Sequence, residues 1–496
     1  MSLRDKRKRA GKCILSTAPK RPASRVLKTR DEKRPGGSVI ISGQQRNRTT
    51  IFMNTRTSTR RDFLKTSALA LPLVMAGCSS ISKPAAGAGE FISVRNRRFE
   101  RRGKPYHFIG ANFYQAAMLA DPALLGGRAQ LVRELDMLHA VGVTNLRLLA
   151  ASEGSVAAGD KRRGIVQQPG QWDEGLLQGL DFTLAEMARR DMTGVLYLTN
   201  YWEWSGGMAM YVHWATGEPI PDPKQPGKKH TGADHMNFAA RFYAMPAAQK
   251  SYRQYLAYLL NRHNTVNGRR YADDPTVMAW QLSNEPRPGM DEAITEANLP
   301  AFYTWMDETA RFIKARAPRQ LVSTGNEGTI GCLGKSDVFL KVHQSPAVDY
   351  ATLHLWVKNW GWLTEPRLGP QYEEAVARAN HHIEQHIDLA EQLGKPLVME
   401  EFGIDRDNAS TDPDSPTTMR DDFYEKMFHS LIGSCQAGGP LQAANFWVWS
   451  GEGTLEALRQ RRAVREPVDL NGVLLTDQTT LAVIRKNNAK LASLVS

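Results

Sequence analysis

The chain has 496 residues and a formal net charge of +13, from 64 lysine or arginine residues and 51 aspartate or glutamate residues. This length suits one large α/β barrel with extra segments, or two to three smaller domains. Residues 1–65 hold 19 of the basic residues but only 4 of the acidic ones, which leaves 45 basic and 47 acidic residues in the rest. The folded part is therefore nearly neutral, which argues against a nucleic-acid partner.

The basic N-terminal segment has two parts. No periodicity or signal appears before Met53, so we expect Met53 to be the true start and residues 1–52 to be a basic extension outside the mature protein. Residues 53–77 resemble a twin-arginine export signal, in which Arg60 and Arg61 precede an uncharged apolar run. That run is too short to cross a bilayer comfortably.

The export signal ends in Ala76-Gly77-Cys78, which is similar to a bacterial lipoprotein box. The resemblance implies that Cys78 is lipidated and anchors the protein to a membrane after export by the twin-arginine route. The location would be periplasmic or at the cell surface, and Ser79 favours the outer membrane where the cell has one. A plain cleaved signal with an incidental cysteine is the alternative. Residues 78–90, rich in Ser, Ala, Gly and Pro, suit a flexible tether.

Cysteine and histidine spacing gives no sign of a metal site. Cys332 and Cys435 lie too far apart for a disulfide framework, and we expect buried free thiols. His381, His382 and His386 lie in a polar helical pattern, so we expect a solvated helix face rather than metal ligands. Neither a metal nor an organic cofactor is expected.

Apolar strand patterns alternate with helical patterns over residues 91–496. The strand patterns cover residues 106–112, 144–149, 194–199, 277–283, 320–324, 350–355, 397–402 and 443–449. The helical patterns cover residues 127–140, 173–190, 247–267, 299–317, 372–393, 421–435 and 479–494. Eight apolar strands separated by helices predict a single-domain α/β fold, a (β/α)8 TIM barrel.

The longest interval lies between the third and fourth expected strands. It contains residues 205–244, which include Pro219, Pro221 and Pro223. Long loops in compact domains usually serve a function or are disordered. Because this segment follows the C-terminal end of a strand, where barrel enzymes place their catalytic groups, we expect an insertion that overhangs the site.

Two of the expected strands end in carboxylates. Asn284-Glu285-Pro286 closes one apolar run, and Glu400-Glu401 closes another. Cleavage of a glycosidic bond needs two carboxyl groups, because one must protonate the leaving oxygen while the other attacks or activates water. Neither motif is decisive alone.

Aromatic residues also favour a carbohydrate. Flat indole faces suit stacking on sugar rings. Trp280, inside an expected strand, is more typical of the core. Seven of the eleven tryptophans fall at or just beyond strand ends: Trp202, Trp204, Trp356, Trp360, Trp362, Trp447 and Trp449.

In barrel order, these motifs resemble glycoside hydrolase family 5 and, within it, the β-mannanase group. The resemblance runs from about residue 91 to the C-terminus and implies a retaining glycoside hydrolase. The motifs that carry it are Asn145-Leu146-Arg147, residues 198–207, Asn284-Glu285-Pro286, residues 324–328, His354-Leu355-Trp356, Glu400-Glu401-Phe402-Gly403 and Asn445-Phe446-Trp447.

The resemblance implies that Glu285 is the general acid/base and Glu401 the nucleophile. Successive side chains of a strand point to opposite faces, so we expect only one of Glu400 and Glu401 to face the barrel axis. Glu401 matches the motif because it directly precedes Phe402-Gly403, and Glu400 is the alternative.

The resemblance also implies a set of substrate-binding residues. Arg147 would hydrogen-bond the nucleophile and favour its ionised form, and Asn284 would bind the sugar 2-hydroxyl. His354 would orient groups in the same polar network, and Trp447 would form a platform under the reacting sugar. A structural ion pair for Arg147 and a core position for His354 are the alternatives.

One residue departs from the family pattern. The wider family usually carries tyrosine two residues after the histidine of strand six, where its hydroxyl contacts the nucleophile, and this chain has Trp356. An indole N–H donates but does not reproduce the position or acidity of a phenol. We therefore expect Trp356, like Trp202 and Trp204, to contact substrate only.

The sequence thus predicts a monomeric endo-β-1,4-mannanase acting on mannan, glucomannan or galactomannan. An exo-acting β-mannosidase and a β-1,4-glucanase are alternatives, because the two glutamates do not distinguish among them. Several tryptophans suit several sugar subsites, which favours endo action. A surface glycan-binding lipoprotein is the alternative outside enzymes, and the presence of both Glu285 and Glu401 speaks against it.

Overall fold

The computed structural model describes residues 90–154, 163–223, 230–452 and 471–495. The chain divides into two units, residues 1–80 and 81–496, and all the described residues belong to the second. The predicted extension, export signal and Cys78 lie outside the described residues. Among the helices in the described ranges, none combines the length and apolar character needed to cross a bilayer.

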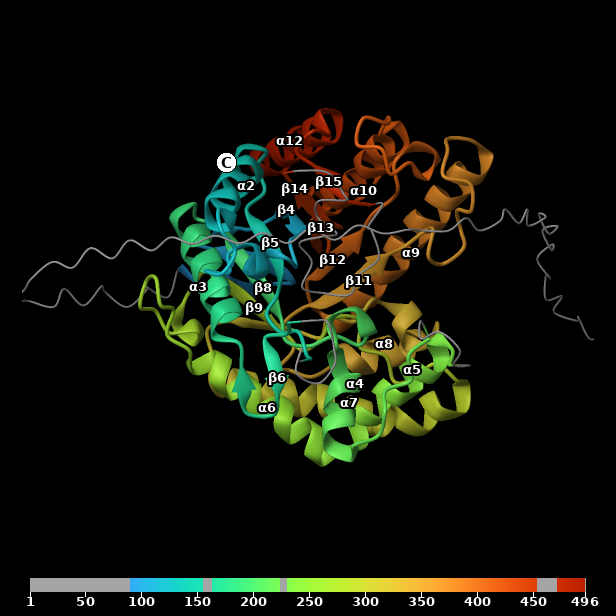
Figure 1. The fold of residues 1–496 in the computed structure, drawn as a ribbon. Helices are drawn as coiled ribbons and strands as arrows, with labels where there is room; N and C mark the ends of the chain where they lie inside the picture. Colours follow the sequence, from blue (N-terminus) through green and yellow to red (C-terminus); the bar gives the residue numbers. More distant parts are fainter. Residues whose placement is uncertain (1–89, 155–162, 224–229, 453–470, 496) are drawn as a thin grey trace, which may run out of the picture. The chain divides into compact units, whose positions relative to one another are not determined.

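Eight parallel strands form one sheet that curls into a barrel (Figure 1). Their order in the sheet is β10-β9-β8-β5-β4-β13-β12-β11, and a parallel bridge between Ser323 and Tyr350 brings the two edges together. The predicted (β/α)8 barrel is confirmed. The strands are β4 (Phe108–Asn112), β5 (Asn145–Leu149), β8 (Thr193–Tyr197), β9 (Val277–Gln281), β10 (Leu321–Ser323), β11 (Ala351–Leu355), β12 (Leu397–Phe402) and β13 (Leu441–Phe446).

Helices between successive strands surround the sheet (Figure 1). Local signals set their ends: the Asp173 side chain accepts a hydrogen bond from the Leu176 amide at the start of α3, and Gly394 ends α9 with a φ of 66°. The helices are α2 (Gly127–Ala140), α3 (Glu174–Arg189), α6 (Pro246–Asn261), α7 (Glu292–Lys314), α8 (Ser336–His343), α9 (Pro370–Leu393), α10 (Thr418–Ala437) and α12 (Gln478–Ser493).

Two helix boundaries differ from the prediction. Helix α7 begins at Glu292 rather than near residue 299 and runs through Pro300, which lies on the exposed side of the helix. Helix α6 ends at Asn261 rather than near residue 267, because the Asn264 side chain accepts hydrogen bonds from the next backbone amides and forms a turn.

The segment at 205–244 is largely helical where it is described. It contains α4 (Gly207–Thr216) and α5 (Gly232–Ala240), and Thr231 and Asp234 form a capping box at the start of α5. The buried Glu153 carboxylate accepts a hydrogen bond from the amide of Gly207 at 2.8 Å, which fixes the first turn of α4. The expected overhanging loop is thus a pair of helices with a connection between them.

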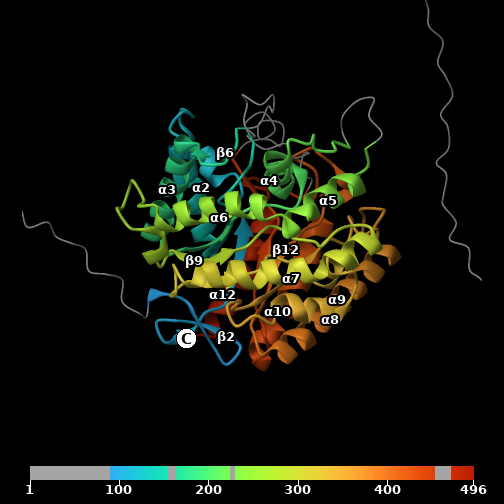
Figure 2. The same ribbon diagram turned by 90° about the horizontal axis from the view of Figure 1, so that it is seen from below.

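A small antiparallel sheet closes the end of the barrel where the strands begin. It consists of β1 (Ser93–Arg95), β2 (Arg98–Arg101) and β3 (Lys104–Pro105). Phe99 of this sheet packs in one buried cluster with Phe108 and Met278, from the first residues of β4 and β9. Figure 2 shows β2 and α4 at opposite ends of this unit, so the small sheet and the insertion cover different faces of the barrel.

The histidine prediction is wrong for two of the three residues. His381 is exposed, but His382 and His386 are buried on the inner face of α9. The rings of His382 and His386 lie 4.2 Å apart and pack against aromatic neighbours, including Trp360 and Phe339. Both histidines lie on the same face of α9 as the buried aliphatic residues Val376, Ile383 and Leu389, so they form part of the packing face of the helix.

Cys332 and Cys435, the cysteines in the described part of the chain, are free, as predicted. Cys332 is buried, whereas Cys435 is only partly buried. Burial raises the pKa of both thiols, that of Cys435 to about 12, so neither is a ready nucleophile.

Candidate active site

Glu285 follows β9 at the end of the barrel where the strands finish. Its φ of 46° places a non-glycine residue in the left-handed region, which costs about 1–3 kcal/mol and persists only where the surroundings impose it. The backbone amide donates to the Gly325 carbonyl at 2.9 Å, and the preceding residue, Asn284, pairs with Asn200 in a parallel bridge. These contacts aim a 7% exposed carboxylate at the barrel axis.

The Glu285 carboxylate is held by two side chains. His354 Nδ1 lies 2.6 Å from Oε1, and the indole N–H of Trp202 donates to Oε2. Burial alone would raise the pKa of Glu285, but the hydrogen bond and charge of His354 lower it to about 2.

Glu401, at the end of β12, faces Glu285 across the same space. Arg147 Nη1 donates to its Oε1 at 2.5 Å, and His354 Nδ1 lies 3.3 Å from its Oε2. One ligand-type atom from each of Glu285, His354 and Glu401 lies within 4.8 Å of the other two. The two carboxylates predicted from strand ends are therefore brought together.

Arg147 on β5 has every nitrogen engaged. Nε donates to Gln281 Oε1 at 2.8 Å, Nη1 to Asn112 Oδ1 at 3.0 Å, and Nη2 to Asn284 Oδ1 at 2.7 Å, in addition to the bond to Glu401. The side chain is fully buried. Such a guanidinium cannot move aside, so it fixes both the predicted nucleophile and the predicted sugar-binding amide.

His354 lies between the two carboxylates. Nδ1 must act as a donor because both neighbours offer only carboxylate oxygens in their ionised form. Burial by itself would lower the pKa of His354, but the negative charges of Glu401 and Glu285 raise it well above its usual 6.5. The two carboxylates therefore favour the charged form of the ring, and His354 belongs to the polar network of the site rather than to the packed core.

The side chain of Glu400 also reaches the barrel interior. The expectation that only one of the two adjacent glutamates faces the axis is wrong: Arg147 lies 3.8 Å from Glu400 and 2.5 Å from Glu401. The register between β11 and β12 shifts here, with Leu353 opposite Met399 but His354 opposite Glu401. This shift removes the simple alternation of faces at Glu400.

Residues 89–496 match the sequence model of the family described as GH family 5 beta-mannosidase-like. The chain belongs to this family. It is therefore a glycoside hydrolase, and the recognition made from its motifs is confirmed at the level of the family.

Individual relatives agree with this assignment. A mannan endo-1,4-beta-mannosidase 3 of Oryza sativa subsp. japonica is 30% identical over 79% of this chain and 78% of the relative. A putative mannan endo-1,4-beta-mannosidase 4 of Arabidopsis thaliana is 29% identical over 76% and 87%. Among solved structures, a glycoside hydrolase family 5 mannosidase from Rhizomucor miehei is 32% identical, with a TM-score of 0.74, over 82% of this chain and 99% of that chain.

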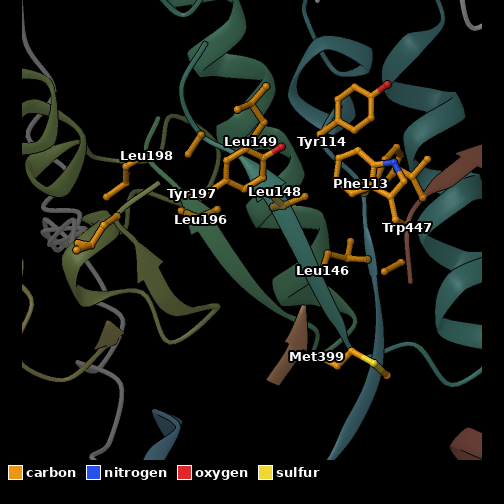
Figure 3. Close-up of a cluster of buried hydrophobic side chains, with 14 of the residues drawn as sticks. Phe113, Tyr114, Leu146, Leu148, Leu149, Leu196, Tyr197, Leu198, Met399 and Trp447 are labelled. Atoms are coloured by element: carbon orange, nitrogen blue, oxygen red, sulfur yellow. The ribbon is translucent and has the colours of Figure 1, made fainter. Parts of the chain in front are cut away.

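The aromatic residues predicted to bind sugar fall into two groups in this family 5 barrel. Trp447 is 5% exposed, stacks against Tyr114 with centroids 5.6 Å apart, and has Trp204 and Trp356 at its edges (Figure 3 shows Trp447 beside Tyr114). Trp202 also reaches the site, because its indole N–H donates to Glu285.

The second group packs around His382 of α9. Trp360 and Trp362 pack against each other and against His382 behind β11. Trp449 is buried and donates to Glu134 of α2 at 3.0 Å, so its predicted place among the sugar-binding tryptophans is wrong. Trp280 is buried in the core as predicted.

Several residues of the site escaped the sequence analysis. Asn112 and Gln281 bind Arg147, and Asn200 accepts from the Asn284 amide at 3.1 Å. Glu327 pairs with Arg287, whose guanidinium lies over the Trp202 ring. A polar residue inside an apolar strand, as at Gln281, was the available signal, because buried polar groups need partners.

Proposed function

We propose that the protein is a retaining endo-β-1,4-mannanase, with Glu285 as general acid/base and Glu401 as nucleophile. The observation that carries this assignment is the close approach of the two carboxylates, whose oxygens lie within 4.8 Å of each other. Retaining glycosidases place their carboxyl groups about 5–5.5 Å apart, whereas inverting enzymes leave about 6.5–9.5 Å for a water molecule.

The contacts suit the two roles. Arg147 donates to Glu401 Oε1 and orients this carboxylate, so that it can attack the anomeric carbon of a bound sugar. Glu285, oriented by Trp202 and His354, protonates the departing oxygen and later takes a proton from the water that releases the sugar. Asn284 is fixed through its oxygen by Arg147, which leaves an N–H for the sugar 2-hydroxyl.

Proton NMR of the first products from mannohexaose tests this mechanism. We expect the β-anomer to form first and the α-anomer to appear only by mutarotation. Initial formation of the α-anomer would contradict Glu401 as a nucleophile and indicate direct attack by water.

The choice of mannan rests on the relatives named for mannan endo-1,4-beta-mannosidase activity and on the mannosidase of known structure, one form of which was solved with mannosyl-fructose. Several tryptophans near the site support an open row of subsites and therefore endo action. A fast fall in mannan viscosity with mixed oligosaccharides is expected. Mannose as the sole early product would establish exo action, and faster hydrolysis of cellulose oligosaccharides would favour a glucanase.

We further propose that the enzyme is an exported lipoprotein held by Cys78. The support for this proposal is the sequence itself, in which Arg60 and Arg61 precede an apolar run that ends in Ala76-Gly77-Cys78. Expression from Met53 should give a membrane-bound protein that Cys78→Ser releases or leaves unprocessed. Recovery of the wild type wholly in the soluble fraction would refute the anchor.

A further inference from the structure

Glu400 is a buried acid that the proposed reaction does not use. Its side chain is 1% exposed and lies beside Arg147, the residue that also binds Glu401. Gln281 Nε2 donates to its Oε2 at 2.6 Å, and the Tyr350 hydroxyl donates to its Oε1 at 3.4 Å. These are the partners of an ionised carboxylate, because each offers a donor to an oxygen that only accepts.

The same carboxylate faces the second nitrogen of His354. His354 Nε2 is buried and has no hydrogen-bond partner within the described part of the chain, and Glu400 Oε2 lies 3.9 Å away. On the other side of the ring, Nδ1 contacts Glu285 and Glu401. The imidazole is therefore surrounded by three carboxylates, of which Glu400 alone lies on the Nε2 side.

The charges around the ring do not cancel if His354 is neutral. The groups that face it or its partners are the carboxylates of Glu285, Glu400 and Glu401, the guanidinium of Arg147, the hydroxyls of Tyr350 and Tyr197, and the Arg287–Glu327 pair. With that pair neutral overall, Arg147 alone would oppose three negative charges. A proton shared by His354 and Glu285 reduces this excess negative charge. Burial lowers the local dielectric constant and so strengthens the repulsion that the proton relieves.

We propose that Glu400 is a positioning residue that keeps one proton on the His354–Glu285 pair, where it serves the cleavage step. The inference rests on the proposed role of Glu285 as general acid. In the free enzyme the proton sits on His354 Nδ1. It then passes across 2.6 Å to Glu285 Oε1, so that the N–H bond breaks, the O–H bond forms and the nitrogen keeps its electron pair.

Glu285 then gives this proton to the glycosidic oxygen as the bond to the anomeric carbon breaks. The neutral imidazole recovers its proton after Glu285 has taken one from the attacking water. Glu400 touches neither sugar nor reacting atoms: it acts through the charge that it places beside His354. The raised pKa of His354 agrees with this placement.

Glu400→Gln tests the proposal, because the amide keeps the shape and removes the charge. Without the negative charge beside it, the His354–Glu285 pair should lose its proton at lower pH. We therefore expect the basic limb of the pH profile of kcat/KM on mannohexaose to shift to lower pH by about one unit or more relative to the wild type. KM should change little. The matched control is Glu134→Gln, a buried, hydrogen-bonded glutamate on α2, which should leave the basic limb in place.

An unshifted basic limb in a folded Glu400→Gln enzyme would overturn the proposal and leave Glu400 a packing residue. Should this variant fail to fold, Glu400→Asp keeps the charge and is expected to retain the wild-type limb at lower thermal stability; a shifted limb would count against us. Nitrogen-15 NMR of the wild type gives a direct readout, with an imidazolium expected for His354 at pH 7 and a neutral ring contradicting the proposal.

These outcomes separate the inference from the proposed function. If Glu400→Gln leaves the basic limb unshifted and the wild type hydrolyses mannan as proposed, only the role of Glu400 is refuted. Near-normal turnover by Glu285→Ala would instead refute the assignment on which the inference depends.

Discussion

Two buried histidine sites differ in the direction of their pKa shifts, although burial lowers the pKa at both. His354, inside the barrel, has its pKa raised well above 6.5 because Glu401 and Glu285 face it. His386, in the helix layer, has its pKa lowered to about 4 by burial, and that of His382 is lowered to about 3. The difference teaches that neighbouring charge, not burial, decides whether a buried histidine is a cation here.

Hydrogen-bond geometry gives the same answer without reference to charge. His386 Nδ1 faces the His382 carbonyl at 2.7 Å, while its Nε2 accepts from the Thr329 amide at 2.9 Å and so must be unprotonated. His354 Nδ1 has only the carboxylate oxygens of Glu285 and Glu401 opposite it, so it donates whenever both carboxylates are ionised. The hydrogen bonds of His354 thus favour the imidazolium, whereas those of His386 favour the neutral ring.

The largest effect should come from removing the carboxylates that define the charged site. Glu285→Ala and Glu401→Ala should each lower kcat on mannan by about 10³-fold or more, because each removes a chemical role. Thermal melting should stay cooperative. Turnover close to the wild type by either folded variant would remove that residue from the mechanism.

The charged site should also depend on its permanent cation. Arg147→Met leaves Glu400 and Glu401 buried beside each other with less positive charge, which should cost about 3–5 kcal/mol in the free energy of unfolding at pH 7. Part of the loss should recover at pH 4.5, where carboxylates accept protons more easily. Urea unfolding at both pH values measures the free energy of unfolding of the variant and the wild type. Equal stability at pH 7 would contradict the view that Arg147 offsets the charges of Glu400 and Glu401.

The neutral histidine site should make the fold sensitive to acid. The folded-state pKa values of His382 and His386 lie below the unfolded value of about 6.5, so the unfolded chain takes up protons first as the pH falls. Their contribution is fully present above pH 6.5 and is lost progressively towards pH 4. At about 1.4 kcal/mol per pH unit, we expect a loss of about 3 kcal/mol for each histidine over this range.

Denaturation of His386→Gln isolates this effect, since the glutamine oxygen can still accept from Thr329. Its stability should fall less between pH 6.5 and 4 than that of the wild type. His381→Gln, the exposed neighbour on the same helix, is the control and should behave as the wild type. The same acid loss in all three proteins would assign it to other groups.

The smallest effect concerns the aromatic group at the mouth of the charged site. Trp204→Ala removes one edge of the Trp447 cluster and should lower kcat/KM on mannohexaose about five-fold, in line with about 1 kcal/mol for an aromatic contact. Trp362→Ala, in the group behind β11, should change kcat/KM less. A larger loss from Trp362→Ala would show that the second group also meets the sugar.

The sequence by itself determined the barrel and the two catalytic candidates. Eight apolar runs separated by helical patterns predicted the strands to within a few residues, because strand and helix periodicity are local properties of the chain. Carboxylates at the ends of apolar runs marked two strand ends as candidate sites. The resemblance to glycoside hydrolase family 5 then singled out Glu285 and Glu401.

Only the tertiary structure decided how the buried polar groups are paired. Side-chain alternation placed Glu400 outside, but the register shift beside Leu353 and His354 brings it next to Arg147. A polar pattern placed His382 and His386 in solvent, but the neighbours that α9 meets bury them. Periodicity tells which residues of one segment share a face, whereas the partner that covers the face comes from elsewhere in the chain and sets both burial and charge.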